Sequence, residues 1–571
     1  MIEPLSAPAT HKAVPPLDTI RRIRAIFSER DIFTVETFYP PADTGAAYSC
    51  SVALGDPPFL GAGFSVNGKG MSPRWALASA YGELMERLSC SALLPEVTGP
   101  PDMRDIPVEA FSEQCPDAFL FGMGVKSRRE LVSFLRAAFG GFIRCVPFQN
   151  RKDSTSVLLP DAMIRDLCGT TGMCAGNTPQ EAMLQGLMEI FERYATRKLY
   201  QFQVTPPEIP KEYFERTEVL NRLQKLDCRF SVRDCSLGKG FPVIGLVLTL
   251  PDGRRTLRLG ASASPVTALE RCLTEIFQGS RAAADQRFQT PGALDPSDQK
   301  QLFTAYAATL ATSSGAWPDA VFDGEPSYPF TGFGETEFEN DGQALSYFVK
   351  FAAKRGGILF ARDCSLLGFP AYKLYMPGAS EAFLNFTLTR DDYVRWMRLR
   401  SHRAIVYSLP TASKEKLEAL ASAVCEARTA LMPIARDPLA WLMNRPMPGV
   451  GVPEGILFPY LFATAGRYTL AAEEMLTYLD SPHSHEGPRL YWSALWVFWS
   501  ALADGSPPDV AADAVSSHYG RTLADRCLHT LDHPHSVFSA KEWPVCPDCD
   551  RCALRFRCAR PEAEALSRQL S

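Results

Sequence analysis

The chain has 571 residues, a formal net charge of −5, 46% hydrophobic residues and 22% charged residues. This is the composition of a folded globular protein with more than one domain, and without a basic stripe we expect no direct contact with nucleic acid. The longest apolar run, from about Val243 to Leu250, has the length of a strand, so we expect no membrane span. The N-terminus resembles no signal peptide. The sixteen cysteines are therefore expected in a cytoplasmic protein, as thiols or metal ligands.

The first part of the chain predicts an alternation of helices and strands. Thr178 and Pro179 are typical of a helix start, because threonine caps the first turn and proline fits the first helical position. In chain order we expect a helix over 15–30, paired strands over 45–67, a turn at 68–70, a helix over 73–90, a loop-rich stretch over 95–130, and a glycine-rich loop over 169–179 that opens a helix to about 200.

A second repeat follows, because Arg-Asp-Cys-Ser-Leu begins at both Arg233 and Arg362 and each copy precedes glycine, proline and an apolar stretch. Both copies predict strand–turn–strand units. We further expect a strand over 252–262, a helix over 265–284, mixed structure over 285–345, and helices over 413–430, 456–479, 489–503 and 508–530. The sequence thus predicts an α/β unit with internal duplication over 1–400 and an all-helical, repeat-like domain over 401–540. The aromatic residues near Trp492 and Trp499 are expected in its core.

Two copies of one short pattern mark the predicted site. Glu83 and Glu86 are followed by Arg87, and Glu189 and Glu192 recur in the same spacing before Arg193. Carboxylates three residues apart share one helix face, and here each face is flanked by apolar residues that predict burial. One such pair usually indicates a solvated ion-pair face, but the repetition favours four carboxylates around a hard cation such as Mg²⁺.

Several neighbouring residues allow two readings. Arg87, Arg193 and Arg271 either bind phosphate oxygens or pair with the adjacent glutamates. Cys174, in the glycine-rich loop, is either a nucleophile at a helix N-terminus or a small buried residue, and the second is the commoner case. Cys235 and Cys364 are expected to be buried. Positions 12 to 401 contain no histidine, so the carboxylates, the metal and the substrate would have to perform any acid–base work there.

The C-terminal residues 541–571 form a short cysteine-rich tail. Four cysteines lie within thirteen residues, at Cys546, Cys549, Cys552 and Cys558. Cysteines at this spacing favour a [4Fe–4S] cluster, while zinc and an unliganded tail remain the alternatives.

The chain resembles the YcaO family of ATP-utilising proteins over roughly residues 10 to 530. The resemblance is carried by Asn67-Gly-Lys-Gly70, Ser79-x3-Glu83-x2-Glu86-Arg87, Met173-Cys-Ala-Gly-Asn177-Thr, Glu181, Glu189-x2-Glu192-Arg193, Ala268-Leu-Glu-Arg271-x3-Glu275, Asp234-x-Ser-Leu-Gly238 and Met376-Pro-Gly378. It is greatest toward stand-alone members with a helical C-terminal domain, described as accessory factors of ribosomal-protein methylthiotransferase. Cys174 departs from the pattern, because serine stands at this position in the relatives. The chain also lacks the proline-rich end of azoline-forming members.

The resemblance implies a YcaO-type fold, an ATP site and a homodimer. It implies that Glu83, Glu86, Glu189 and Glu192 hold Mg²⁺ against the phosphates. The residues implied to line the nucleotide are Lys12, Thr19, Ser79, Cys174, Asn177, Glu181, Arg193, Arg271 and Glu275. The implied reaction is phosphorylation of a peptide or protein amide, for heterocyclisation, thioamidation or related sulfur modification. Two alternatives stay open: an ATP-binding accessory factor for a methylthiotransferase or another sulfur-transfer partner, and a precursor-peptide synthetase with a separate partner protein.

Overall fold

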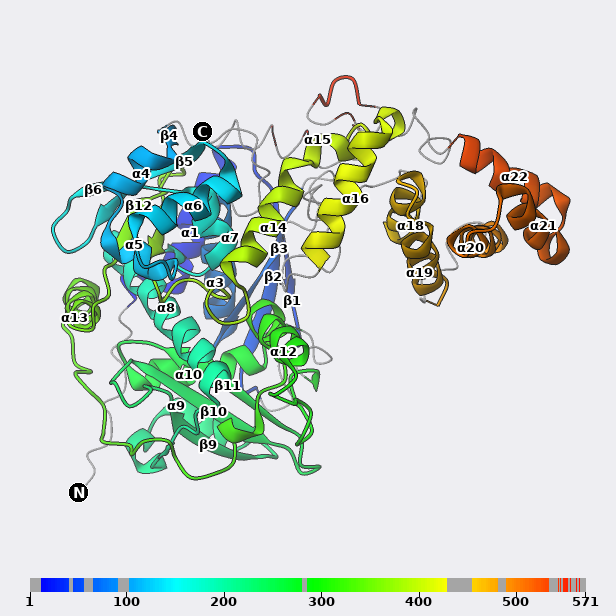
Figure 1. The fold of residues 1–571 in the computed structure, drawn as a ribbon. Helices are drawn as coiled ribbons and strands as arrows, with labels where there is room; N and C mark the ends of the chain where they lie inside the picture. The colour runs from blue at the N-terminus through cyan, green and yellow to red at the C-terminus, as the bar shows by residue number, and fades with distance from the viewer. Residues whose placement is uncertain are drawn as a thin grey trace. The chain divides into compact units, whose positions relative to one another are not determined.

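The computed structural model describes residues 12–40, 45–55, 65–90, 102–279, 285–428, 454–480 and 489–533, with isolated residues from 543 to 564 (Figure 1). The chain divides into two compact units, Met1–Arg390 with Glu562–Ser571 and Asp391–Pro561. The expected domain boundary, near residue 400, lies about ten residues beyond this division. Each unit is described by itself.

The first unit is built on three antiparallel sheets. The first has the order β1 (Thr34–Phe38), β2 (Tyr48–Leu54) and β3 (Ser65–Gly70). The second has the order β11 (Arg255–Ala261), β10 (Val243–Thr249), β9 (Arg229–Asp234) and β8 (Glu208–Ile209). The third runs β4 (Arg104–Pro107), β5 (Phe142–Asn150), β12 (Phe360–Asp363), β13 (Ala371–Tyr375) and β7 (Met173–Ala175), with β6 (Ser156–Leu159) paired to β5.

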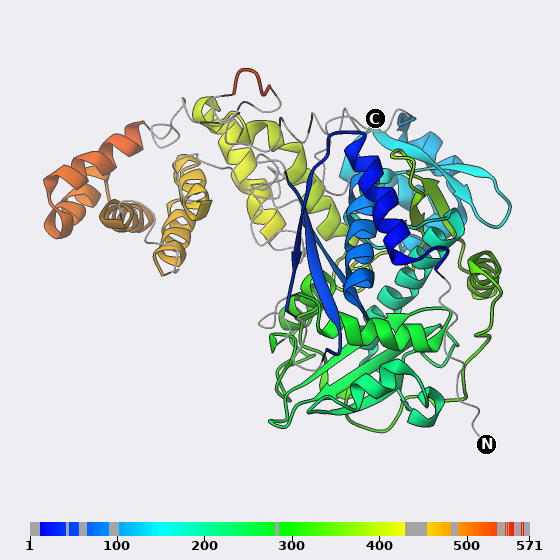
Figure 2. The ribbon, with the colours of Figure 1, turned by 180° about the vertical axis from the view of Figure 1, so that it is seen from behind.

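Helices pack on these sheets and bury their apolar faces. The described helices are α1 (Pro16–Ser28), α3 (Pro73–Ser89), α4 (Val108–Gln114), α5 (Asp117–Gly122), α6 (Arg128–Phe139), α7 (Asp161–Cys168), α8 (Pro179–Phe202), α9 (Glu218–Leu223), α10 (Pro265–Ile276), α12 (Gln299–Thr312) and α13 (Asp341–Ala353), with short 3₁₀ turns at Lys211–Phe214 and Asp319–Val321. Figure 2 shows α1 beside α3 and the long strands of the first sheet, and these elements share one apolar core. The expected α/β architecture is confirmed.

The same strand–helix unit occurs three times, as β3–α3, β7–α8 and β11–α10. Each helix starts with a capping hydroxyl followed by proline, at Ser72, Thr178 and Ser264, and each hydroxyl accepts a hydrogen bond from the backbone N–H three residues on. Each of these helices carries glutamates, so a shared local sequence produces three similar acidic helices. The two Arg-Asp-Cys-Ser-Leu repeats form the antiparallel pairs β9–β10 and β12–β13, which confirms the strand–turn–strand prediction.

The turn predicted at 68–70 is wrong, because these residues complete strand β3. The two glycines in this strand allow α3 to pack closely against it, and they do not reverse the chain direction. A Cβ on Gly68 would lie 2.0 Å from the carbonyl oxygen of Ala76, and one on Gly70 would lie 2.6 Å from the Cβ of Trp75. Helix α3 can therefore rest directly on the strand only when these positions have no side chain.

Other boundaries also differ from the sequence-based expectation. The stretch 95–130, expected as loop, contains β4, α4, α5 and the start of α6. The first three of these are each seven residues or shorter, too short for a periodic pattern to reveal. The helix expected over 265–284 ends at Ile276. The mixed stretch 285–345 contains α12 and the start of α13.

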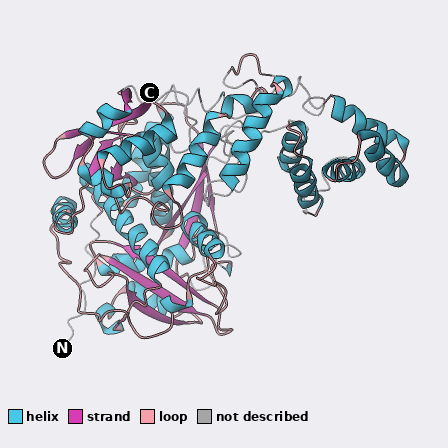
Figure 3. Cartoon of the chain, viewed as in Figure 1, coloured by secondary structure: helices cyan, strands magenta, loops and turns pink. Residues whose placement is uncertain are grey.

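The second unit is entirely helical in its described part (Figure 3). Its elements are α14 (Arg390–Ser401), α15 (Arg403–Val406), a 3₁₀ turn (Leu409–Thr411), α16 (Lys414–Arg428), α18 (Glu454–Thr464), α19 (Tyr468–Leu479), α20 (Arg489–Ala503), α21 (Pro508–Tyr519) and α22 (Arg521–Asp532). From α18 onward each helix contacts the next, as in a repeat-like array. The stretches 456–479 and 508–530, each expected as one helix, are each divided into two helices. Gly466 and Gly520 adopt positive φ at the two breaks. Trp492, Phe498 and Trp499 are buried, as expected, whereas Trp496 is half-buried.

No described helix combines the length and apolarity needed to cross a membrane.

One carboxyl of α10 gives a pH-dependent prediction for stability. Burial, with repulsion from Glu218, raises the pKa of Glu270 to about 7 from its ordinary 4.5. The folded chain holds this proton more tightly than the unfolded chain, so stability falls as the pH rises from about 4.5 to about 7. We expect Glu270→Gln to raise the free energy of unfolding by about 1–3 kcal/mol at about pH 8 and by much less at about pH 5.

Denaturant unfolding at both pH values checks this prediction. Glu29→Gln is the matched control, because this glutamate is 74% exposed at the end of α1. If Glu270→Gln raised the free energy of unfolding equally at both pH values, the raised pKa of Glu270 would be contradicted.

Candidate functional site

Two helices that are distant in sequence bring the paired carboxylates together. Helices α3 and α8 both contact strands β7 and β13, which lie side by side in the third sheet. On α3, helical spacing places Ser79, Glu83 and Glu86 on one face, with Ser79 half-buried. On α8 it places Glu189 and Glu192 on one face. Apolar neighbours at other positions of both helices fill the two adjoining cores.

The arginines of the two motifs contact these glutamates. Arg87 forms ion pairs with Glu83 at 3.2 Å and with Glu86 at 3.3 Å. Arg193 Nε lies 3.8 Å from Glu189 Oε1. Arg87 and Arg193 therefore lie beside glutamates of their own helices, and their contact with phosphate stays a prediction.

The buried carboxylates nevertheless repel one another. The side chain of Glu86 is only 15% exposed. Burial raises the pKa of Glu86 well above its ordinary value; Arg87 opposes this shift, and Glu189 and Glu83 add to it. Burial also raises the pKa of Glu189, again against the arginines and with repulsion from Glu192 and Glu83. The four carboxylates thus act on one another across the space between α3 and α8, where a cation would relieve their repulsion.

The donor chemistry of this site fits Mg²⁺, because the ion prefers oxygen ligands and usually takes one or two carboxylates plus phosphate oxygens. Among the described residues, no group of three or more His, Cys, Asp or Glu side chains is placed to hold a metal ion. The predicted carboxylates thus share one region without forming a closed cage in this conformation.

Four residues predicted to line the nucleotide form a second group, where α1 meets the start of α8. Lys12 forms an ion pair with Glu181 at 3.0 Å, and Thr19 Oγ1 donates to Asn177 Oδ1 at 3.1 Å. The backbone N–H of Asn177 donates to Glu181 at 3.2 Å. The side chain of Glu181 is 6% exposed and that of Lys12 is 46% exposed, so the group extends from the protein interior to the surface. Glu181 and Glu192 fall on the same face of α8, which connects the group to the carboxylates.

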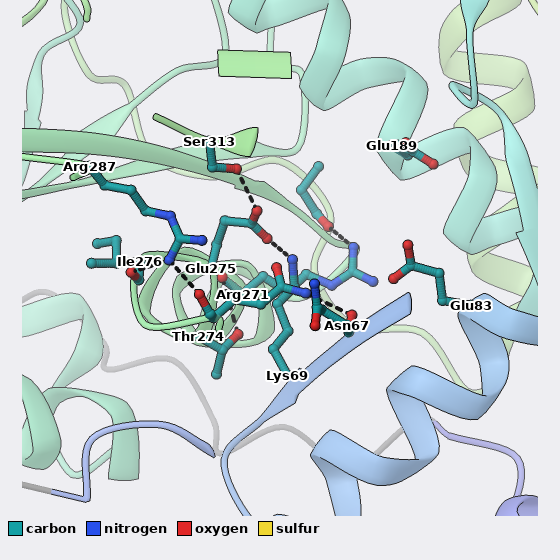
Figure 4. A network of polar contacts seen from close by, with 12 residues as sticks. Asn67, Lys69, Glu83, Glu189, Arg271, Thr274, Glu275, Ile276, Arg287 and Ser313 are labelled. Atoms are coloured by element: carbon teal, nitrogen blue, oxygen red, sulfur yellow. Dashed lines mark hydrogen bonds and ion pairs between the residues drawn. The ribbon is translucent and has the colours of Figure 1, made fainter. Parts of the chain in front are cut away.

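A third group lies on α10, the helix of the third strand–helix unit (Figure 4). Arg271 donates to the side chain of Gln185 on α8 and to the carbonyl oxygen of Ala261 at 2.8 Å. Glu275 accepts a hydrogen bond from Ser313 Oγ at 2.7 Å and forms an ion pair with Lys69. Figure 4 shows the Glu83 carboxylate facing Arg271, and Glu192 and Glu189 attract the same guanidinium, so the three acidic helices converge.

Cys174 lies in the core between β7 and α8, close enough to Glu86 and Glu189 for both carboxylates to act on its thiol. It has no exposed surface, and its thiol donates to the carbonyl oxygen of Tyr372 at 3.4 Å. Burial raises its pKa well above the ordinary thiol value, which opposes the reading as a nucleophile. The expectation that Cys174 contacts the nucleotide stays a prediction. Cys235 and Cys364 are buried as expected.

The sequence reasoning missed three polar residues of this region: Lys69, Gln185 and Ser313. The sequence does carry a signal for Lys69: it lies between two glycines of a strand. Because alternate strand residues face opposite sides, its side chain points away from the face that the glycines form. Gln185 also had a signal, since it lies one turn before Glu189 on the same helix. Ser313 had none, because its contact with Glu275 depends on the tertiary fold. Of the tail cysteines, Cys546 and Cys558 lie outside the described residues.

A comparison with known families identifies the fold. The family described as YcaO cyclodehydratase, binding ATP and Mg²⁺, matches residues 67–380, more than half of the chain. The chain belongs to the YcaO family. The match includes both carboxylate pairs and the acidic helix α10, whereas Lys12 and Thr19 lie before it.

Two curated relatives are similar to the chain. One is the ribosomal protein S12 methylthiotransferase accessory factor YcaO of Escherichia coli, 29% identical over 376 residues, or 61% of this chain and 62% of that protein. The other is an uncharacterised protein of Haemophilus influenzae, 30% identical over 352 residues, or 56% of this chain and 57% of that protein. The chain thus spans about 60% of the length of these relatives.

Solved structures with YcaO or heterocyclase descriptions are also similar. A heterocyclase in complex with substrate and cofactor has a TM-score of 0.49 and 17% identity, covering 68% of this chain and 55% of that chain. A YcaO protein from Methanopyrus kandleri bound with AMPPCP and Mg²⁺ has a TM-score of 0.43 and 20% identity, covering 65% of this chain and 92% of that chain.

Proposed function

We propose that this YcaO protein is a Mg²⁺–ATP-dependent enzyme that phosphorylates an amide of a peptide or protein. The observation that carries the proposal is the convergence of two Glu-x-x-Glu-Arg motifs on α3 and α8, with Arg271 facing them from α10. The phosphorylated amide would serve heterocyclisation, thioamidation or a related sulfur modification. Family membership supports ATP and Mg²⁺ as the ligands.

The site's own residues would bind and orient the reactants. Glu83, Glu86, Glu189 and Glu192 would hold Mg²⁺, which supplies charge neutralisation at the phosphates. Arg193 and Arg271 would leave their present partners to donate to phosphate oxygens, as guanidinium groups do well. The remaining lining residues would be Lys12, Thr19, Ser79, Asn177, Glu181 and Glu275. This division of labour suits a region without histidine, because phosphoryl transfer depends mainly on positioning and charge neutralisation.

In the proposed reaction a nucleophile, either a Cys, Ser or Thr side chain of the substrate or sulfide, adds to the amide carbon. The amide oxygen then attacks the γ-phosphorus of ATP, and ADP leaves. Loss of phosphate carries away the former amide oxygen and completes the heterocycle or thioamide. This reaction therefore predicts that an oxygen isotope placed in the substrate amide appears in the released phosphate.

That isotope transfer is the test. The purified chain is incubated with Mg²⁺, ATP and a library of peptides containing Cys, Ser and Thr, with and without sulfide. Mass spectrometry identifies peptides that lose water or exchange oxygen for sulfur, and those sequences are then made with labelled amide oxygen. Labelled phosphate supports amide activation. Modified peptides that release unlabelled phosphate would contradict it.

The similarity to the Escherichia coli accessory factor favours a second candidate. In this reading the chain binds ATP and assists a methylthiotransferase or another sulfur-transfer partner, without modifying a substrate itself. Methylthiolation of ribosomal protein S12 by a methylthiotransferase, measured with and without the chain, separates the two functions. Stimulation without any ATP-dependent peptide product would favour the accessory role.

We also propose that the tail cysteines Cys546, Cys549, Cys552 and Cys558 bind a [4Fe–4S] cluster, with zinc as the alternative, on the strength of their spacing. We expect iron and acid-labile sulfide in chain purified without oxygen, and their loss in a Cys549→Ser/Cys552→Ser variant. Zinc in their place would select the alternative, and metal-free protein would contradict both. A cytoplasmic homodimer is the proposed state of the protein.

A further inference from the structure

Lys69 is placed by strand geometry toward the three acidic helices. Gly68 and Gly70 face α3, where a Cβ would collide with the helix. Since alternate residues of a strand point to opposite sides, Lys69 points away from that interface. Its side chain is 30% exposed and forms an ion pair with Glu275 of α10.

The charges around Lys69 belong to the proposed nucleotide site. Glu192 of α8 and Glu83 of α3 attract its ammonium group, whereas Arg271 and Arg193 repel it. Burial, the largest influence, lowers the pKa of Lys69 to about 8. The charge is therefore costly to keep here, although two carboxylates of the motifs support it.

A structural role alone accounts poorly for this lysine. Strand β3 is already held to the end of α10, because Gln278 Nε2 donates to the carbonyl oxygen of Asn67 at 2.7 Å. The neighbouring strand β2 is held as well, because the backbone N–H of Gly279 donates to Ser49 Oγ at 3.1 Å. An ion pair with partners 30% and 22% exposed would add little to these contacts.

We propose that Lys69 is a phosphate-binding residue of the nucleotide site, which exchanges its ion pair with Glu275 for a phosphate oxygen when Mg²⁺–ATP binds. The inference rests on the proposed nucleotide site and adds a residue to it. A lysine suits this exchange, because its ammonium is a compact charge with three donors on a flexible stem. Figure 4 shows the Lys69 and Glu275 side chains meeting beside Arg271, with Glu83 on the other side of Arg271.

The test compares a phosphate-bearing ligand with a phosphate-free one. Mg²⁺ with a non-hydrolysable ATP analogue, and adenosine alone, are titrated into wild type, Lys69→Met and Lys69→Arg. We expect Lys69→Met to weaken binding of the analogue by about 10- to 100-fold, the loss of one charged hydrogen bond, and to leave adenosine binding unchanged. Lys69→Arg should restore most of the loss. Lys198→Met on α8 is the matched control, because burial lowers the pKa of this second lysine to about 8 as well.

Equal weakening of both ligands, or of neither, would overturn the assignment. A measurement on wild type guards against a misfolded variant: acetylation of Lys69 by an amine reagent, followed by mass spectrometry. The ATP analogue should protect Lys69 and adenosine should not, and equal labelling in both cases would also overturn the inference. If wild type binds neither ligand, the proposed nucleotide site fails first, and the role of Lys69 fails with it.

Discussion

Replacing Glu192 or Glu86 by glutamine is expected to lower the rate of Mg²⁺-dependent ATP hydrolysis by about 10²–10³-fold or more. Glutamine keeps the shape of the side chain but loses the charge needed to hold Mg²⁺ against the phosphates. For Glu86 the fold should gain stability at the same time, because burial and its acidic neighbours raise the pKa of this carboxyl. Loss of turnover with unchanged or higher stability is thus the combined signature of the account.

Steady-state release of ADP and thermal unfolding of the same preparations measure both quantities. Glu29→Gln, at the exposed end of α1, is the control for removing one negative charge from the surface. Wild-type turnover in both Glu86→Gln and Glu192→Gln would show that the carboxylate pairs do not bind the metal. If a variant loses turnover because it unfolds, the loss says nothing about metal binding. Glu189→Gln is then measured in place of that variant.

The second large effect concerns Gly68, where we expect Gly68→Ala to lower the free energy of unfolding by about 3 kcal/mol or more. The new Cβ would lie 2.0 Å from the carbonyl oxygen of Ala76 and 2.4 Å from the backbone nitrogen of Ala80. Both atoms belong to the backbone of α3, so the whole helix must move. Because α3 carries Glu83 and Glu86, nucleotide affinity should fall as well.

Gly82 provides the matched control, because it lies inside the same helix and a Cβ there meets nothing within 4 Å. Gly82→Ala should raise the free energy of unfolding by about 0.5–1 kcal/mol through the better helix propensity of alanine. Denaturant unfolding of the two variants compares them directly. Equal stabilities would contradict the packing of α3 on β3.

Local signals in the sequence predicted the acidic helices well. Ser72, Thr178 and Ser264, each followed by proline, mark the helix starts within a residue, because capping depends only on neighbouring residues. The carboxylate spacing also placed the two glutamates of each motif on one face of its helix. These features needed no knowledge of distant contacts.

Features that depend on distant contacts could not be predicted in the same way. Gly68 and Gly70 look like turn residues until α3 is known to lie against them. Arg87 and Arg193 match phosphate ligands in sequence, yet in the structure Arg87 pairs with Glu83, and Arg193 donates to the carbonyl oxygen of Leu310 at 3.4 Å. The pair of Lys69 with Glu275 joins residues more than 200 positions apart, which no local pattern encodes.

Calorimetric titration of a non-hydrolysable ATP analogue, with and without Mg²⁺, tests the central claim most directly: the paired carboxylates of α3 and α8 hold a metal–nucleotide complex. The account predicts tight binding by wild type only when Mg²⁺ is present, and loss of that Mg²⁺ dependence in Glu86→Gln and Glu192→Gln. Binding of the same strength without Mg²⁺, or unchanged Mg²⁺-dependent binding in both variants, would contradict it.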